Sequence, residues 1–142
     1  MKNPEKAVEY LKNGFNCSQS VLKTFAPSYG LDDETCTRLA APFGGGIGHL
    51  QETCGAVTGA IMVLGLRHGA GCESRDVREH LNGMVQAFVA EFKERHGSVV
   101  CRTLLGCDIS TKSGLEAARA RGAFVVCADY VRTAAELLDK RL

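Results

Sequence analysis

The sequence lacks both an excess of one charge and a long apolar segment. Seventeen basic residues against sixteen acidic ones leave a net charge of +1, so no global field draws the chain to nucleic acid or to an anionic membrane. The longest uncharged run, residues 53–66, is shorter than the roughly 20 residues that span a bilayer. Charged residues also interrupt residues 1–14, where a secretory signal would need an apolar stretch. We therefore expect a cytoplasmic protein with no membrane insertion and no nucleic-acid partner.

Several motifs of enzymes and metal proteins are missing as well. The sequence contains neither a Ser-His-Asp order nor paired carboxylates in an apolar setting, the patterns that would indicate a hydrolase. No Cys-x-x-Cys pair is present, which excludes a zinc ribbon, a thioredoxin-type motif and covalent c-type haem. The glycine-rich stretch at residues 44–48 lacks the GxGxxG spacing and the Gly-Lys-Ser/Thr ending of nucleotide-binding loops. Whether this stretch serves a sulfur site or merely joins two helices is left open.

Apolar periodicity predicts the fold. No segment alternates with period two for long, while apolar residues recur at helical spacing in segments bounded by capping residues, proline or glycine. We expect one all-α domain over residues 1–142, a compact bundle of five to seven helices with the glycine-rich loop before a central apolar helix. The expected helices cover residues 3–12, 16–27, 32–41, 54–68, 74–96, 113–121 and 124–141, with a short helical segment at 98–105.

The main feature that the sequence does contain is its seven cysteines. This number is unusual for a protein expected in the cytoplasm, because structural disulfides are rare there. Cys17, Cys54 and Cys101 fall in the first turn of an expected helix. There the unpaired N–H groups and the helix dipole should lower a thiol pKa and stabilise a thiolate or an anionic cluster. Cys127, expected on the core face of the last helix, supplies a fourth sulfur if the helix ends meet. The alternative is that all four are small core residues.

The sequence predicts less about the roles of the remaining three cysteines and of two histidines. Cys36 lies on an apolar stripe and is expected to pack in the core, whereas Cys72 is expected to be an exposed loop thiol. Cys107 stays open, with a role as a resolving thiol as one interpretation. His49 and His68 flank the 54–68 helix, where a solvated position is the more common outcome and a ligand or base role the alternative.

Four short motifs also resemble a known family. In chain order they are Asn16 to Val21, Cys54 to Gly59, the Cys-Arg-Thr-Leu-Leu-Gly segment that begins at Cys101, and Cys127. This order resembles the C_GCAxxG_C_C family of redox-active proteins, and the similarity runs over nearly the whole chain. The resemblance implies that Cys17, Cys54, Cys101 and Cys127 are the signature cysteines. Related modules in split-Soret cytochromes, with which an iron-sulfur centre is associated, further imply a cluster site.

The sequence thus predicts a cysteine-based redox or electron-transfer protein. We assign Cys17, Cys54, Cys101 and Cys127 as the catalytic residues and as the ligands of an iron-sulfur cluster. One alternative is a metal-free thiol/disulfide protein that exchanges with a redox partner protein or a small thiol. Others are a structural zinc on the same four thiolates, or a non-redox helical interaction module with packing cysteines. Enzymatic activity, and a homodimer through the Gly/Ala face of the 54–68 helix, are left open.

Overall fold

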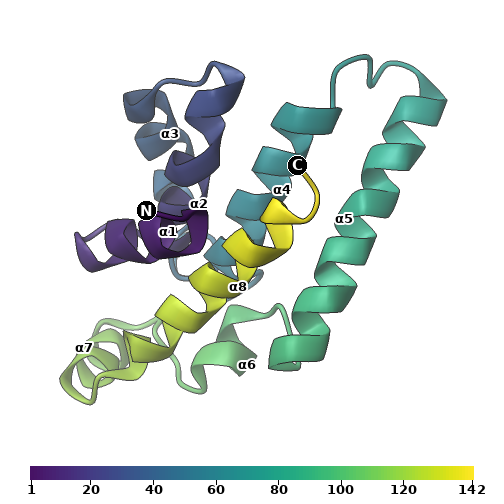
Figure 1. Ribbon diagram of the computed structural model, residues 1–142. Coiled ribbons are helices and arrows are strands. Elements are labelled where there is room, and N and C mark those ends of the chain that lie inside the picture. Colours follow the sequence, from purple (N-terminus) through teal and green to yellow (C-terminus); the bar gives the residue numbers. More distant parts are fainter.

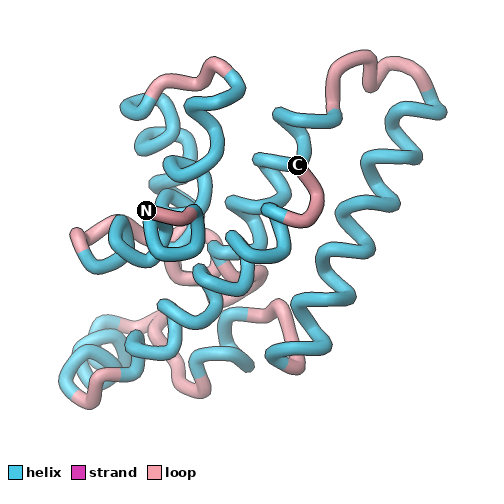
Figure 2. The backbone as a smooth tube through the Cα atoms, in the orientation of Figure 1, coloured by secondary structure: helices cyan, strands magenta, loops and turns pink.

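The computed structural model describes residues 1–142 and consists of helices joined by turns and one longer loop (Figure 1). The α-helices are α1 (Asn3–Lys12), α2 (Cys17–Phe25), α3 (Asp33–Ala40), α4 (Gly55–His68), α5 (Arg75–His96), α6 (Cys101–Leu105), α7 (Lys112–Ala120) and α8 (Cys127–Asp139). Three short 3-10 helices complete the fold: η1 (Ala26–Tyr29), η2 (Ala41–Phe43) and η3 (Ala123–Val126). Figure 2 shows helix and loop and no strand. The all-α prediction is confirmed, although eight α-helices exceed the expected range because the short segment before Gly106 forms α6.

Side-chain caps fix the starts of three helices, α2, α3 and α7. Asn16 and Gln19 form a reciprocal capping box on α2, with N–H to side-chain oxygen distances of 2.8 and 2.9 Å. Asp32 caps α3 by accepting a hydrogen bond from the Thr35 N–H at 2.7 Å. The sequence predicts Ser113 as the capping residue of the helix expected over 113–121, and this is wrong by two residues. Thr111 takes the capping position there, so that α7 begins at residue 112.

The main core, a cluster of 21 buried residues, lies where α1, α2, α4, α5 and α8 meet. The central apolar helix α4 packs most extensively against α2, in which every residue after Cys17 is buried. Gly59 makes this close approach possible, because a Cβ there would lie 2.7 Å from the carbonyl oxygen of Ser18. The α2–α4 contact therefore brings the starts of these two helices close together.

A second and much smaller core is formed at the other end of the molecule, below α8 in the view of Figure 1. Its buried residues are Leu105, Ile109 and Ala118, contributed by α6, the turn after it and α7. Cys107, Phe124 and Cys127 pack partly against them. We call this cluster the small core.

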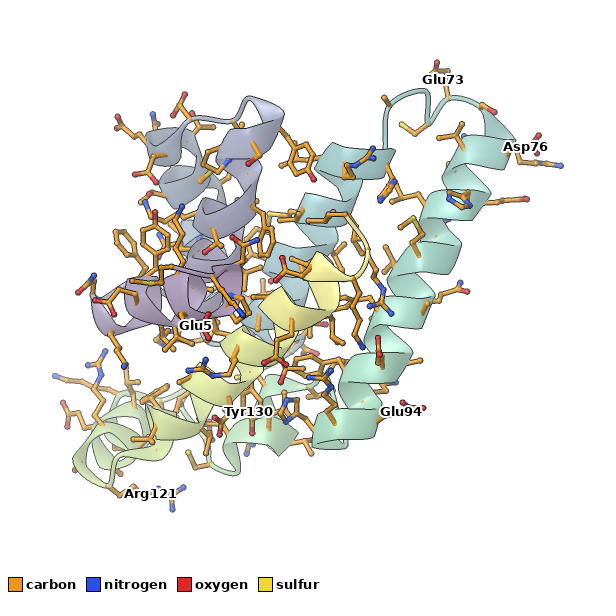
Figure 3. All side chains as sticks on the ribbon, in the orientation of Figure 1. Glu5, Glu73, Asp76, Glu94, Arg121 and Tyr130 are labelled. Carbon is orange, nitrogen blue, oxygen red and sulfur yellow. The ribbon has the colours of Figure 1, made fainter.

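The long helix α5 stands along one side of the molecule and contacts α4 and α8. It contributes two fully buried side chains, Phe88 and Phe92, to the main core. Charged side chains such as Glu73, Asp76 and Glu94 project away from the core in Figure 3. None of the helices combines the length and the apolar character that crossing a membrane would require.

Candidate functional site: four cysteines around one cavity

Each of the four cysteines that the sequence predicts as site residues stands at the start of a helix. Cys17, Cys101 and Cys127 are the first residues of α2, α6 and α8, and Cys54 is the N-cap of α4. The sequence predicted this position for three of them and missed Cys127, because the apolar pattern of α8 continues back to Phe124. The structure breaks the helix there with η3, so that α8 itself begins at the cysteine.

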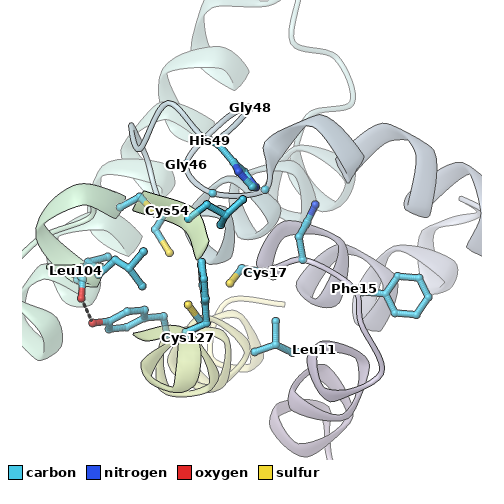
Figure 4. A pocket seen from close by; sticks show the side chains of 18 of the residues that line it. Leu11, Phe15, Cys17, Gly46, Gly48, His49, Cys54, Leu104 and Cys127 are labelled. Carbon is cyan, nitrogen blue, oxygen red and sulfur yellow. Dashed lines mark hydrogen bonds between the residues drawn. The ribbon is translucent and has the colours of Figure 1, made fainter. Parts of the chain in front are cut away.

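These helix starts surround one cavity of about 580 Å³, and all four cysteines line it (Figure 4). Figure 4 shows Cys17, Cys54 and Cys127 pointing toward a common space. No aspartate or glutamate is among the lining residues, and the charged or titratable groups besides the thiols are His49, Arg119 and Tyr130. The cavity is therefore a mostly apolar, carboxylate-free space with four thiols on its walls.

A short antiparallel backbone contact holds Cys54 and Cys101 next to each other. Thr53 and Val100 form an isolated β-bridge between the two segments. The N–H of Cys54 donates to the carbonyl of Val99 at 2.7 Å, and the N–H of Cys101 donates to the carbonyl of Glu52 at 2.7 Å. This contact ties the starts of α4 and α6 together, although they are far apart in the sequence.

The glycine-rich loop forms one wall of the cavity and packs directly against Cys101. Gly46 has a left-handed backbone with φ of 72°, and a Cβ on it would lie 2.6 Å from the Cβ of Cys101. Gly44 approaches Asn16 as closely, since a Cβ there would meet the Asn16 amide nitrogen at 2.9 Å. Only glycine allows the loop to pack this tightly against the starts of α2 and α6.

The same loop holds an unusual backbone. Ile47, His49 and Gln51 also adopt positive φ, at 70°, 60° and 58°. This region is uncommon for residues with a side chain, and it is a clear outlier for the β-branched isoleucine. The surrounding contacts must hold these residues in place, as is typical of strained segments beside functional sites.

Two residues of the site gave no signal in the sequence reasoning. Gln51 is buried, with its amide nitrogen 2.7 Å from the carbonyl of Cys107 and its amide oxygen 2.9 Å from the N–H of Ile109. It stands in a polar stretch that resembles an ordinary loop. Tyr130 lines the cavity and donates from its hydroxyl to the carbonyl of Leu104 at 2.7 Å. Its position one turn after Cys127 could have drawn attention to it.

Burial controls the protonation of the thiols. It raises the pKa of Cys54 to about 12, and together with the neighbouring Cys127 it raises the pKa of Cys101 to about 11. Hydrogen bonding with Cys127, followed by burial, raises the pKa of Cys17 well above its ordinary value. The expectation that helix starts lower these three pKa values is wrong. Loss of solvation and repulsion between neighbouring sulfurs outweigh the N–H groups of Ala56 and Val57 that favour the Cys54 thiolate.

Cys127 behaves differently from the other three. The hydrogen bond from Cys17 lowers the pKa of Cys127, although burial acts in the opposite direction. Because Cys17 retains its proton and donates it, Cys127 is the thiol of this pair that ionises first. Of the four thiols that line the cavity, Cys127 is therefore the one whose pKa is lowered rather than raised.

The four thiols are not arranged around a single point. No three His, Cys, Asp or Glu side chains of the structure are placed so that they could hold one metal ion. A tetrahedral zinc site brings every thiolate to about 2.3 Å from the metal, whereas here the sulfurs are distributed over the walls of the cavity. Four thiolates nevertheless match the donor set that iron-sulfur clusters use.

The other cysteines and histidines lie where the sequence suggested or away from the site. Cys36 is fully buried in the main core, and Cys72 is exposed in the turn between α4 and α5. Cys107 is half-buried against the small core, near Cys101 but not among the lining residues. His49 is an exposed residue at the edge of the cavity, and the ring of His68 pairs instead with the carbonyl of Arg141 at 3.1 Å.

The fold and site define a small helical protein with four helix-start thiols around one cavity. The family model described as "Putative redox-active protein (C_GCAxxG_C_C)" matches residues 15–141. The chain belongs to this family of redox-active cysteine proteins, as the order of its cysteines predicted. No curated protein and no solved structure matches the chain.

Proposed function

We propose that Cys17, Cys54, Cys101 and Cys127 ligate an iron-sulfur cluster and that the protein transfers electrons. The observation that carries this proposal is that four thiols from four different helix starts line a single cavity of about 580 Å³. A bound cluster would supply one-electron redox chemistry, and thiolates are its usual ligands. Sulfurs spread over the walls of a cavity suit a cluster better than a single zinc ion, which draws its ligands to one point.

The electrostatics of the cavity support the same proposal. A cluster with four thiolates carries net negative charge, and no carboxylate lines the cavity to oppose it. The N–H groups of Ala56 and Val57 at the start of α4 favour a thiolate at Cys54, as helix starts generally favour negative charge. The N–H groups of Gly44, Gly45 and Gly46 also donate to no acceptor within the protein. The raised thiol pKa values make thiolates unfavourable in the metal-free state, and the positive charge of iron would offset this cost.

The chain's own residues would hold and shield such a group. Leu104, Phe124 and Tyr130 line the cavity with apolar surface that limits the access of water. Gly46 lets the loop approach Cys101 without a side chain between them. Because burial and hydrogen bonds set the potential of such centres, these contacts would tune the redox potential.

Anaerobic purification and reconstitution with iron and sulfide test this proposal. The wild type is expected to become brown, with iron and acid-labile sulfide in the protein, and Cys54→Ser is expected to lose most of both. Cys72→Ser is the matched control, because its thiol is exposed in the turn between α4 and α5. A colourless wild type without iron or sulfide after reconstitution would exclude the cluster.

A second candidate, a metal-free dithiol centre, is favoured by the position of Cys17 and Cys127 as neighbours on the wall of the same cavity. In this reaction the Cys127 thiolate attacks a disulfide, forms a mixed disulfide and releases one thiolate. Cys17 then attacks the Cys127 sulfur and releases the second thiolate, which takes up the proton of Cys17. One protein thiolate and one protein thiol are oxidised to a disulfide, and the substrate disulfide is reduced to one thiolate and one thiol. The substrate would be a redox partner protein or a small disulfide.

Thiol counting decides on this second candidate. Mild oxidation with a small disulfide should remove two thiols per molecule from the wild type and from Cys36→Ser, whose thiol is fully buried in the main core. Cys127→Ser should abolish the loss. An unchanged thiol count in the wild type would rule out the dithiol reaction.

A further inference from the structure

Helix α6, which carries Cys101, is lightly held in the structure. It has five residues, of which Leu105 alone is buried. Its start is fixed by backbone hydrogen bonds from Cys101 and Arg102 to the carbonyls of Glu52 and Gln51, at 2.7 and 3.2 Å. The far end of the helix needs a separate attachment if Cys101 is to keep a fixed direction.

Tyr130 provides an attachment within the helix, in addition to the burial of Leu105 in the small core and the bonds of Gln51 to Cys107 and Ile109 just beyond it. Its hydroxyl donates to the carbonyl of Leu104 at 2.7 Å, the hydrogen bond drawn in Figure 4. Leu104 follows Cys101 by one helical turn, and Tyr130 follows Cys127 by one helical turn. The hydrogen bond thus joins α6 to α8 one helical turn after the cysteine of each helix.

The tyrosine ring is itself held by the main core. Its centroid lies 6.2 Å from that of Phe92 and 4.9 Å from that of His96, both on α5. His96 is fixed in turn by a 2.8 Å contact between its Nε2 and the hydroxyl of Thr133. The position of the Tyr130 hydroxyl is therefore set by α5 and α8, and the hydrogen bond transmits it to α6.

We propose that Tyr130 is a positioning residue that sets the spacing of Cys101 and Cys127 and keeps the four-thiol cavity open. The inference rests on the proposed cluster function and names the residue that favours cluster binding over disulfide closure. Cys101 and Cys127 are close neighbours on the cavity wall, and a disulfide forms when two Cα atoms come within about 4.4–6.8 Å. Without the Tyr130 hydrogen bond the end of α6 is held less firmly, and Cys101 gains access to such geometries with Cys127.

The test compares Tyr130→Phe, which keeps the ring and removes the hydroxyl, with Tyr29→Phe. Tyr29 is the matched control, because it packs against the main core and its hydroxyl makes no hydrogen bond in the structure. Metal-free proteins are oxidised with glutathione disulfide, and the Cys101–Cys127 disulfide is quantified by peptide mapping. Tyr130→Phe should form it about fivefold more readily than wild type, the factor that corresponds to about 1 kcal/mol for one lost hydrogen bond.

A second measurement follows the loss of a reconstituted cluster to an iron chelator, which should be about fivefold faster in Tyr130→Phe and unchanged in Tyr29→Phe. If Tyr130→Phe forms the Cys101–Cys127 disulfide no more readily than wild type, the positioning role is overturned. A wild type that takes up no iron defeats the proposed cluster, while the disulfide measurement on metal-free protein still decides on Tyr130. General destabilisation would appear in thermal unfolding without selecting this one pair of cysteines.

Discussion

The main core and the small core differ sharply in how well they are packed, and the four cysteines lie between them. The main core has 21 buried residues, and Cys54 is one of them while Cys17 packs against it. The small core has three, with Cys127 packed against them and Cys101 at the start of the adjoining α6. Any group that binds all four sulfurs would therefore connect a well-packed part of the molecule to a lightly packed one, and would stabilise the second part most.

The largest expected loss of unfolding free energy comes from removing a large side chain from the main core. Phe92 is fully buried, stacks on Phe88 at 6.5 Å between ring centroids and supports the ring of Tyr130. Phe92→Ala should lower the free energy of unfolding by about 3–5 kcal/mol, since the neighbouring helices cannot collapse fully into the space. Denaturant unfolding followed by circular dichroism measures this loss. A loss below about 1 kcal/mol would contradict the assignment of Phe92 to a tightly packed core.

The boundary between the two cores is tested by a pair of loop glycines. Gly46→Ala should cost about 3 kcal/mol, because the new Cβ would lie 2.6 Å from the Cys101 Cβ and 2.7 Å from the Gln51 Cα. Gly48→Ala should cost only about 1 kcal/mol, because φ is 56° but no atom lies within 4 Å. Equal losses of unfolding free energy in the two variants would show that close packing against Cys101 is not what Gly46 provides.

The free energy of unfolding of the metal-free protein should also depend on pH, because of the buried thiols. The pKa of Cys54 is about 12 in the folded protein against 9.0 ordinarily, so the unfolded chain releases this proton first. The contribution of the Cys54 thiol to the free energy of unfolding is therefore fully present below pH 9 and decreases as the pH rises toward 12. Between about pH 9 and 11 the metal-free protein should lose about 2–3 kcal/mol of unfolding free energy through this thiol.

Cys54→Ser is the control for this measurement, because other groups ionise in the same range. Its unfolding free energy should fall less steeply with pH than that of the wild type. Cys101 contributes with the same sign over a narrower range, since its pKa is about 11 and its side chain is only half-buried. Identical slopes in the wild type and Cys54→Ser would contradict the burial of an un-ionised Cys54 thiol.

Local patterns were sufficient to predict much of the fold and the position of most cysteines. Asn16 with Gln19, and the apolar periodicity of α5, act within one or two turns of chain, so the sequence contains the whole signal. The pairing of Gln51 with Cys107 and Ile109, and of Tyr130 with Leu104, joins segments distant in sequence. The prediction of lowered thiol pKa values was wrong for the same reason. Burial arises from tertiary packing, which the position of a cysteine in a helix does not reveal.

A truncation in the small core should cost less than one in the main core. Ile109 is buried there beside Leu105 and Ala118, but the cluster lies near the surface and can close around a smaller side chain. Ile109→Ala should therefore lower the free energy of unfolding by about 2 kcal/mol, the low end for such a truncation. Amide hydrogen exchange should quicken in α6 and α7 and stay unchanged in α2 and α4, because a lightly packed part opens on its own. Equal acceleration in all four helices would mean that the two cores unfold as one unit, and the cysteines would then lie inside a single cooperative structure rather than between two.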